Sequence, residues 1–333
     1  LVSLLLALLL SYPMVLHPNM AIGSLDGDGG KHLWNLWWMR AEFWRGDWGI
    51  HTSFVNYPEG MNLYPIEPLN GIFTVLLPLP PVLLSNLLAL LHLSLTGIFA
   101  GALGRRICGA VAGDFTSLSY DSEVGGLVAG ALAQGSAFTA FTLHVGVGEL
   151  RQVWWIPLGL LCGWELREAS SRRGWRLVIL WSLALAACLA GAVLSCFYHG
   201  FFLATALSLW ALFTLRIRFK LLMGYAISAG LALLLVYPIV HTFSQNYGVE
   251  DHHPRIGLMD WMRHWEQPIE TYRHAALDPA EAIFPRMEER KQTDRQMMAY
   301  TGGRYLGVTT LFLAFLGCVA SFRRAAPWLG VAL

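Results

Sequence analysis

Two aspartates follow an apolar N-terminal segment, in the stretch GSLDGDGGKHLWNLWWMR at residues 23–40. An ionised carboxylate, Asp28 or failing that Asp26, can act as a general base that removes a proton from a hydroxyl while its oxygen attacks an activated carbon. The other carboxylate can bind a divalent metal or orient the acceptor. A structural interpretation is also open, because Asp28 followed by two glycines can cap a helix. Capping needs only one of them, and carboxylates are costly beside lipid.

The segment that must position these aspartates is rich in tryptophan. Its rings recur at roughly helical spacing, interleaved with charged residues, and are Trp34, Trp37, Trp38, Trp44 and Trp48. This pattern is typical of an amphipathic helix in the headgroup layer of a membrane. We therefore expect a first outer loop, residues 17–68, that contains an interfacial helix whose rings lie at the membrane surface.

The composition places most of the chain in lipid. Hydrophobic residues make up 55% and charged residues 14% of the 333 residues, and the mean hydropathy is +0.48. Apolar stretches that can cross a bilayer recur between charged breaks. The predicted spans are 1–16, 82–104, 124–142, 152–166, 175–197, 201–215, 221–240 and 306–322. Residues 69–80 are short and closed by prolines, which predicts a re-entrant helix. The sequence predicts an all-α, polytopic transmembrane bundle over residues 1–333, trimmed at both ends.

Basic residues predict the orientation of the bundle, since Lys and Arg mark the cytoplasmic loops. They fall between spans on one side, at Arg105, Arg106, Arg167, Arg172, Arg173, Arg176, Arg216, Arg218, Lys220, Arg323 and Arg324. The spans then alternate correctly only if residues 17–68 and a second long loop, 241–305, lie outside. The second loop should also contain helices, because Asp278 and Pro279 form a helix start. All histidines except His92 fall on the outer side, so we expect the chemistry there.

Further polar residues could join the aspartates at the outer face. Tyr64 and Glu67 lie in a loop rich in proline and glycine, which suits sugar binding. His144, Glu149 and Arg151 lie in a short outer turn whose glycines allow close approach to a ligand. His199 reaches the same layer. Candidate substrate-binding residues are thus Tyr64, Glu67, His144, Glu149, Arg151, His199, Arg304 and Tyr305.

Residues that could bind a phosphate or a metal ion also fall on the predicted outer side. Arg304, beside Tyr305, can grip a lipid-linked phosphate with its guanidinium, and Arg151 is the second choice. Binding of ordinary headgroups is the alternative for Arg304. A divalent ion held by Asp28, His144 and Glu149 is possible, but the spacing does not fix a metal, and no other cofactor is indicated.

Several protein classes are disfavoured. The five cysteines are scattered without a C-x-x-C pair, which argues against a zinc knuckle or a disulfide framework. The net charge of +1 and the lack of a basic tract argue against a nucleic-acid partner. No phosphate-binding glycine loop of an ATP-driven motor is present. A transporter is disfavoured because ionisable residues are nearly absent from the spans.

The phrases LDGDGGKHLWNLWW (25–38) and FVNYPEGMNLYPIEPLNGIF (54–73) together resemble the first outer loop of bacterial GT-C glycosyltransferases. The stretches 144–161 and 302–317 are similar to segments of uncharacterised relatives, so the resemblance spans nearly the whole chain. It implies a GT-C-like bundle in the bacterial cytoplasmic membrane whose active face is periplasmic or extracellular. It also implies that Asp28, or Asp26, is the catalytic base.

The resemblance implies inverting transfer of a sugar from a polyprenyl-phosphate donor to a glycan, lipid or protein acceptor. The implied partners are membrane lipids and the lipid-linked sugar. The alternative is a catalytically silent GT-C-like subunit of a larger membrane complex, in contact with other membrane proteins.

Overall fold

The computed structural model describes residues 1–21, 28–45, 51–52, 54, 61–62, 67–112, 120–171, 174–214 and 218–246. This part of the chain is mostly helical. Its first helices are α1 (Val2–Leu10), the 3-10 turn η1 (Met14–Leu16), α2 (Asp28–Trp44), α3 (Pro68–Leu76), α4 (Pro81–Ala112) and α5 (Tyr120–Gln134). They are followed by α6 (Ala137–Val145), the 3-10 turn η2 (Glu149–Gln152), α7 (Trp155–Ser171), α8 (Arg176–Ser195), α9 (Phe197–Thr214) and α10 (Phe219–Asn246).

One short strand pair interrupts the predicted all-α pattern. Strand β1 (His51–Thr52) pairs antiparallel with β2 (Met61–Asn62), two residues on each side. So short a pairing adds no layer to the fold, and the described residues otherwise form helices and connecting turns.

Three described helices are long and apolar enough to cross a membrane. They cover Pro81–Ala110, Arg176–Ser195 and Phe219–His241, and they match the predicted spans 82–104, 175–197 and 221–240. The predicted span 306–322 and the second long loop, residues 247–305 of it in particular, lie outside the described residues. These helices support the prediction of a membrane protein.

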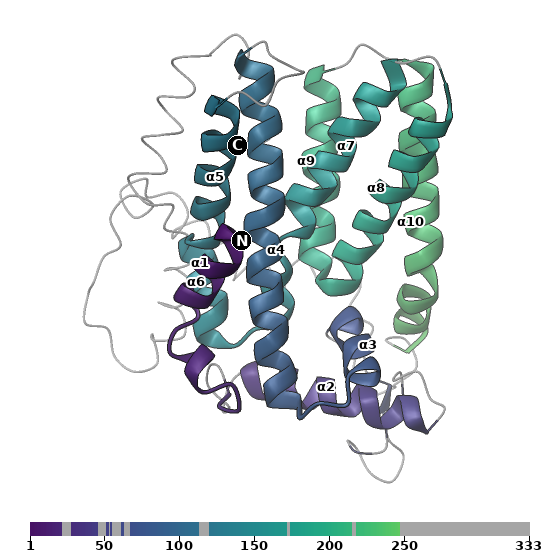
Figure 1. The fold of residues 1–333 in the computed structure, drawn as a ribbon. Helices are drawn as coiled ribbons and strands as arrows, with labels where there is room; N and C mark the ends of the chain where they lie inside the picture. Colours follow the sequence, from purple (N-terminus) through teal and green to yellow (C-terminus); the bar gives the residue numbers. More distant parts are fainter. Residues whose placement is uncertain are drawn as a thin grey trace, which may run out of the picture.

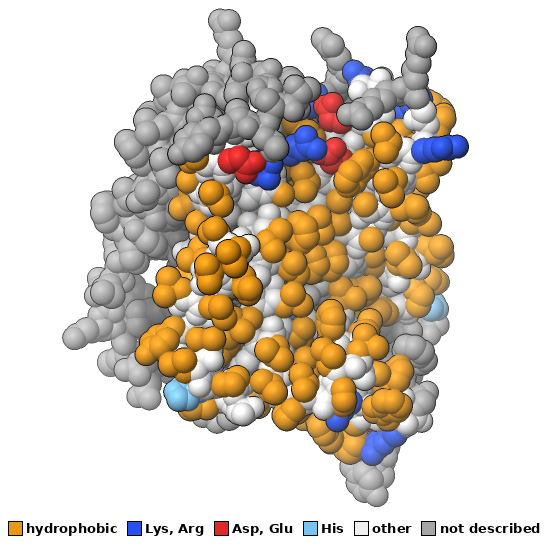
Figure 2. Space-filling model, viewed as in Figure 1, with side chains coloured by type: hydrophobic (Ala, Val, Ile, Leu, Met, Phe, Trp, Pro, Cys, Tyr) orange, Lys and Arg blue, Asp and Glu red, His pale blue; other side chains and the backbone are white. Residues whose placement is uncertain are grey.

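The long helices stand side by side in a bundle, while α2 lies across one end with α3 beside it (Figure 1). The main apolar core lies among α7, α8 and α9, and includes Leu166, Leu185, Leu203 and Trp210. Figure 2 shows hydrophobic side chains over the middle of the visible face and charged side chains toward its ends. We call the two ends the Glu67 end, where α2 and α3 lie, and the Arg105 end.

Ion pairs join neighbouring helices at the Arg105 end. Arg105 and Glu123 lie 2.7 Å apart, which links α4 to α5, and Arg106 and Glu165 lie 2.5 Å apart, which links α4 to α7. The side chains of Arg105, Glu123 and Arg106 are each more than 40% exposed. Solvent therefore screens these pairs, and each adds little to stability.

Two predicted spans differ from the structure in their helix boundaries. The stretch 124–142 is two helices, since α5 ends at Gln134 and Ser136 caps the start of α6 by accepting a hydrogen bond from the Thr139 N–H at 3.2 Å. The stretch 1–16 is α-helical only to Leu10, since Pro13 has no N–H with which to continue the helix. The predicted re-entrant helix at 69–80 is present as the short α3.

The helix predicted to carry the tryptophans is also present, but its rings do not all face outward. Trp37 and Trp44 are 42% and 71% exposed, as expected of interfacial rings. Trp38 is instead buried and stacks on Trp34, with 5.3 Å between ring centroids. The prediction that every ring lies at the surface is wrong for Trp38, because one face of α2 packs on α3 and α4. Trp48 lies outside the described residues.

Candidate functional site

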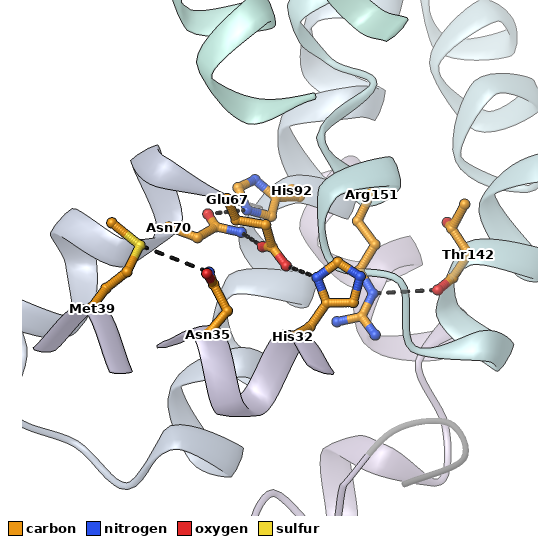
Figure 3. Close-up of polar contacts among 8 residues, drawn as sticks. All are labelled: His32, Asn35, Met39, Glu67, Asn70, His92, Thr142 and Arg151. Atoms are coloured by element: carbon orange, nitrogen blue, oxygen red, sulfur yellow. Dashed lines mark hydrogen bonds and ion pairs between the residues drawn. The ribbon is translucent and has the colours of Figure 1, made fainter. Parts of the chain in front are cut away.

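A buried carboxylate, Glu67, lies where α2, α3 and α4 meet at the Glu67 end (Figure 3). Glu67 is the residue before α3, and Pro68 takes the first helical position, where a missing N–H costs nothing. The two carboxylate oxygens accept hydrogen bonds from different side chains. His32 Nδ1, from α2, bonds Oε1, and Asn70 Nδ2, one turn into α3, bonds Oε2. Helices α2 and α3 are thereby tied together through one carboxylate.

The hydrogen-bond chain continues from Asn70 into the bundle. Asn70 Oδ1 lies 3.0 Å from His92 Nε2 on α4, and Trp154 Nε1 donates to His92 Nδ1 over 3.0 Å. An indole N–H can only donate, so Nδ1 of His92 must be the acceptor. The ring then carries its proton on Nε2 and donates to Asn70. The bonds run in one direction, from Trp154 through His92 and Asn70 to Glu67, and every one supplies a donor toward the carboxylate.

Arg151 brings a buried positive charge to the same region. It belongs to η2, is 7% exposed, and its Nε donates to the Thr142 carbonyl over 3.4 Å. Burial lowers the pKa of Arg151 to about 10, and the negative charge of Glu67 opposes that change. The guanidinium therefore stays charged at neutral pH. In the described part of the chain, no carboxylate lies within ion-pair distance of it, so its Nη groups keep donors in reserve.

The charge state of Glu67 follows from its neighbours. Burial raises the pKa of the carboxyl, but the hydrogen bond and charge of His32, the hydrogen bond of Asn70 and the charge of Arg151 outweigh burial and hold the pKa below its ordinary value. Glu67 is thus an anion at neutral pH. The backbone of Gly148 also comes close, because a Cβ at that position would collide with the Glu67 carboxylate. Glycine is required there by the close approach of backbone and carboxylate.

A second group of buried polar atoms lies next to this network. His199, at the start of α9, is 3% exposed and lies within electrostatic range of His92. Among the described residues, neither ring nitrogen of His199 has a hydrogen-bond partner, and neither does Nε2 of Gln152. Buried polar groups are normally paired with protein or water. These atoms therefore leave hydrogen-bonding capacity beside the Glu67 network.

The structure brings several of the predicted residues together. Glu67, Arg151 and His199 all lie within electrostatic range of His92, and the charges of Glu67 and Glu149 both reach Cys196. Asp28 is the first residue of α2 and precedes His32 by one helical turn. The side chain of His144, in the last turn of α6, is not among those described, and the remaining predicted residues lie outside the described part: Asp26, Tyr64, Arg304 and Tyr305.

The metal prediction stays untested. Within the described ranges, no group of three or more His, Cys, Asp or Glu side chains is arranged to hold a metal ion. Two of the three predicted ligands, Asp28 and His144, have side chains outside the described set. The role of the predicted base, Asp28, is untested for the same reason.

Sequence reasoning missed the partners that hold Glu67. The sequence alone singles out neither His32, one of the outer histidines, nor Asn70. His92 was set apart from the other histidines, yet it bonds to the same network. A signal was available for it, because an imidazole within an otherwise apolar span is a site candidate by default. For His32 the signal is weaker. Its spacing of three and four residues from Asn35 and Leu36 places the three on one face of α2, and the structure buries that face.

Comparisons with known proteins add no relative to this picture. No protein-family model, no curated protein and no solved structure matches the chain. The chemistry of the residues around Glu67 and Arg151 therefore carries the functional inference.

Proposed function

We propose that the protein transfers a sugar from a polyprenyl-phosphate donor to an acceptor hydroxyl at the outer membrane face, on a GT-C-like bundle. The observation that carries this proposal is a buried, incompletely paired guanidinium, Arg151, beside an anionic carboxylate at the end of the bundle where α2 begins. A phosphate leaving group requires such a cation, and an attacking hydroxyl requires a base nearby.

The reaction is a single displacement with inversion. The acceptor oxygen attacks the anomeric carbon, the bond from that carbon to the phosphate oxygen breaks, and polyprenyl phosphate leaves with the electron pair. Asp28 accepts the hydroxyl proton, with Asp26 as the second choice. Arg151 donates its Nη hydrogens to the departing phosphate oxygens, which charge-assisted bonds stabilise as negative charge develops. Arg304 is a further cation for this phosphate.

Glu67 and its partners serve this reaction by positioning. Glu67 fixes the start of α2 through His32, one turn after Asp28, and its charge keeps Arg151 ionised. Burial excludes water, so these electrostatic interactions act in a medium of low dielectric constant. Polar groups around the sugar come from Tyr64, His144, Glu149, His199 and Tyr305.

A second candidate, a catalytically silent subunit of a membrane assembly, is favoured by one specific observation. Both oxygens of Glu67 are already bonded to protein donors, and the residue is 1% exposed. A carboxylate engaged in this way can hold α2, α3 and α4 together without any chemistry. In that case the network serves architecture alone.

The two candidates are separated by activity in lipid vesicles. The full chain is reconstituted with polyprenyl-phosphate hexoses carrying a labelled sugar and with a lipid or glycan acceptor, and released polyprenyl phosphate and the anomeric configuration of the product are measured. We expect inverted product, loss of at least a hundredfold in rate for Asp28→Asn, and a similar loss for Arg151→Gln. Glu123→Gln, at the Arg105 end, is the matched control. Turnover of no donor, or an unchanged rate in Asp28→Asn, favours the subunit.

A further inference from the structure

Buried polar atoms without a partner lie on both sides of the junction between η2 and the start of α9. Gln152, the last residue of η2, is 1% exposed, and His199, the third residue of α9, is 3% exposed. Within the described part of the chain, Nε2 of Gln152 and both ring nitrogens of His199 lack a hydrogen-bond partner. A buried polar group costs free energy unless it is bonded, so such atoms mark a place that a bound molecule completes.

The fold holds the two segments that carry these side chains together. Nε1 of Trp155, the first residue of α7, donates to Oγ of Ser195, the last residue of α8, over 2.7 Å. Gln152 precedes Trp155 by three residues, and His199 follows Ser195 by four. Because η2 also packs directly against α8, the free polar atoms of the two segments belong to one junction.

The junction belongs to the Glu67 end of the bundle. The turn η2 packs against α4, and His92 of α4 lies within electrostatic range of both Arg151 and His199. Arg151 is the residue before Gln152 in η2. The free polar atoms therefore lie beside the cation that the proposed transfer assigns to the phosphate.

These free atoms include an acceptor as well as donors. Burial disfavours the charged form of an imidazole, so the His199 ring is neutral and offers one N–H and one acceptor nitrogen. The amide nitrogen of Gln152 offers N–H donors only. A hydroxyl group satisfies both side chains at once, because it accepts a hydrogen from the amide and donates its own hydrogen to the imidazole.

The phosphate of the lipid-linked donor cannot take the place of this hydroxyl. The oxygens of a phosphodiester only accept hydrogen bonds, which suits the Arg151 guanidinium but leaves the acceptor nitrogen of His199 unpaired. The hexose joined to that phosphate carries the hydroxyls that His199 requires.

We propose that Gln152 and His199 bind one hydroxyl of the transferred hexose and thereby select the sugar. The inference rests on the proposed function, because the lipid-linked hexose supplies the hydroxyl. It adds Gln152 to the groups around the sugar and gives His199 a defined part, the recognition of a single hydroxyl. A hexose that lacks this hydroxyl leaves buried polar atoms unpaired, which is how sites of this kind reject an analogue.

The test measures binding without transfer. The full chain in detergent, with no acceptor present, is titrated with polyprenyl-phosphate hexoses, and the tightest of them is compared with its monodeoxy analogues. The rise in unfolding temperature with ligand concentration gives each Kd. We expect removal of one particular hydroxyl to weaken wild-type binding about tenfold or more. The double variant His199→Phe with Gln152→Leu should bind that analogue and its parent equally.

Unfolding without ligand provides the control for folding. Gln152→Leu conserves the side-chain volume and removes an amide without a partner, so it should not lower the unfolding temperature. Alone it should still reduce the discrimination severalfold, which keeps the test valid where the larger Phe ring disturbs packing at position 199.

Gln134→Leu is the matched control for the loss of a buried amide. Gln134 is 2% exposed, but its Nε2 already donates to the carbonyls of Ser3 and Leu93. This variant should lower the unfolding temperature and keep the wild-type discrimination between the parent and the monodeoxy donors.

Three results would overturn the proposal. Equal binding of the parent and every monodeoxy donor by the wild type would show that no hydroxyl is recognised, as expected of a junction completed by water. Binding of hexose donors no tighter than polyprenyl phosphate alone would exclude a sugar contact. Unchanged discrimination in the double variant would assign the recognition to other residues. By contrast, discrimination without turnover would overturn the proposed transfer and leave this inference standing, and turnover without discrimination would do the reverse.

Discussion

The two ends of the bundle handle charge in opposite ways. At the Glu67 end, Glu67 and Arg151 are 1% and 7% exposed; a directed chain of hydrogen bonds ends on Glu67, and Arg151 donates to the Thr142 carbonyl. At the Arg105 end, Arg105 pairs with Glu123 and Arg106 with Glu165, and the side chains of Arg105, Glu123 and Arg106 are each more than 40% exposed. Charged residues of the same types should therefore contribute very differently to the free energy of unfolding at the two ends.

Burial explains this difference in the contribution of charged residues to stability. A charge taken out of water is stable only when its partners replace the lost hydration, so each partner of a buried charge becomes essential. An exposed charge keeps its hydration and can lose a partner at small cost. Loss of a partner should therefore cost much more at the Glu67 end than at the Arg105 end, where water can replace it.

Removal of the Glu67 charge should give the largest effect. Glu67→Gln removes the negative charge near the Arg151 cation and places a side-chain amide N–H against the donor of His32 or Asn70. We therefore expect a loss of about 3–5 kcal/mol in the free energy of unfolding. The measurement is denaturant unfolding in detergent, followed by tryptophan fluorescence. Arg151→Gln combined with Glu67→Gln should lose less than the sum of the two single variants, because neither charge is then left alone. Additive losses would contradict the coupling of the two residues.

The pH dependence of the same carboxylate should confirm its charge. The pKa of folded Glu67 lies below the ordinary value of 4.5, so its contribution to stability is fully present above pH 4.5. The contribution is then lost as the pH falls through the lower, folded pKa. We expect the difference in unfolding temperature between wild type and Glu67→Gln to stay constant from neutral pH to about 4.5 and to shrink below it. A difference that already shrinks near pH 6 would show that the carboxyl is not held as an anion.

A substitution at Gly148 tests the packing around Glu67 without changing any charge. In Gly148→Ala the new Cβ collides with the Glu67 carboxylate, which cannot move without breaking its bonds to His32 and Asn70. We expect a loss of about 1–3 kcal/mol in thermal or denaturant unfolding. Gly230→Ala is the matched control, since a Cβ there meets nothing within 4 Å. Equal effects of the two substitutions would show that the close approach at Gly148 does not constrain the network.

The sequence predicted the helical character of the chain because hydropathy reports directly on the solvent of each segment. It also predicted α2 and α3, whose signals are local: tryptophans at helical spacing in α2, and prolines around α3. The break at Ser136 was missed, since a capping serine gives a weak signal within an apolar stretch. Trp38 was placed wrongly, because which face of α2 packs on the protein depends on α3 and α4, distant in sequence.

The site was only partly predictable for a related reason. Glu67, Arg151 and His199 were selected from residue type and place in the outer loops, and the structure brings them within range of His92. The bonds that give Glu67 its charge come from His32 and Asn70, on elements that meet only in the folded bundle. Periodicity and composition do not show which elements contact one another in the folded bundle.

The smallest effect is expected at the Arg105 end. Glu123→Gln removes one partner of an ion pair in which Arg105 and Glu123 are 42% and 41% exposed. Since solvent screens the pair and can replace the lost contact, the unfolding free energy should change by less than about 1 kcal/mol. Denaturant unfolding under the same conditions as for Glu67→Gln makes the measurement, and raised salt should reduce the change further. A loss as large as that of Glu67→Gln would mean that exposure does not set the weight of a charge in this bundle, because helix-to-helix ties would then count equally at both ends.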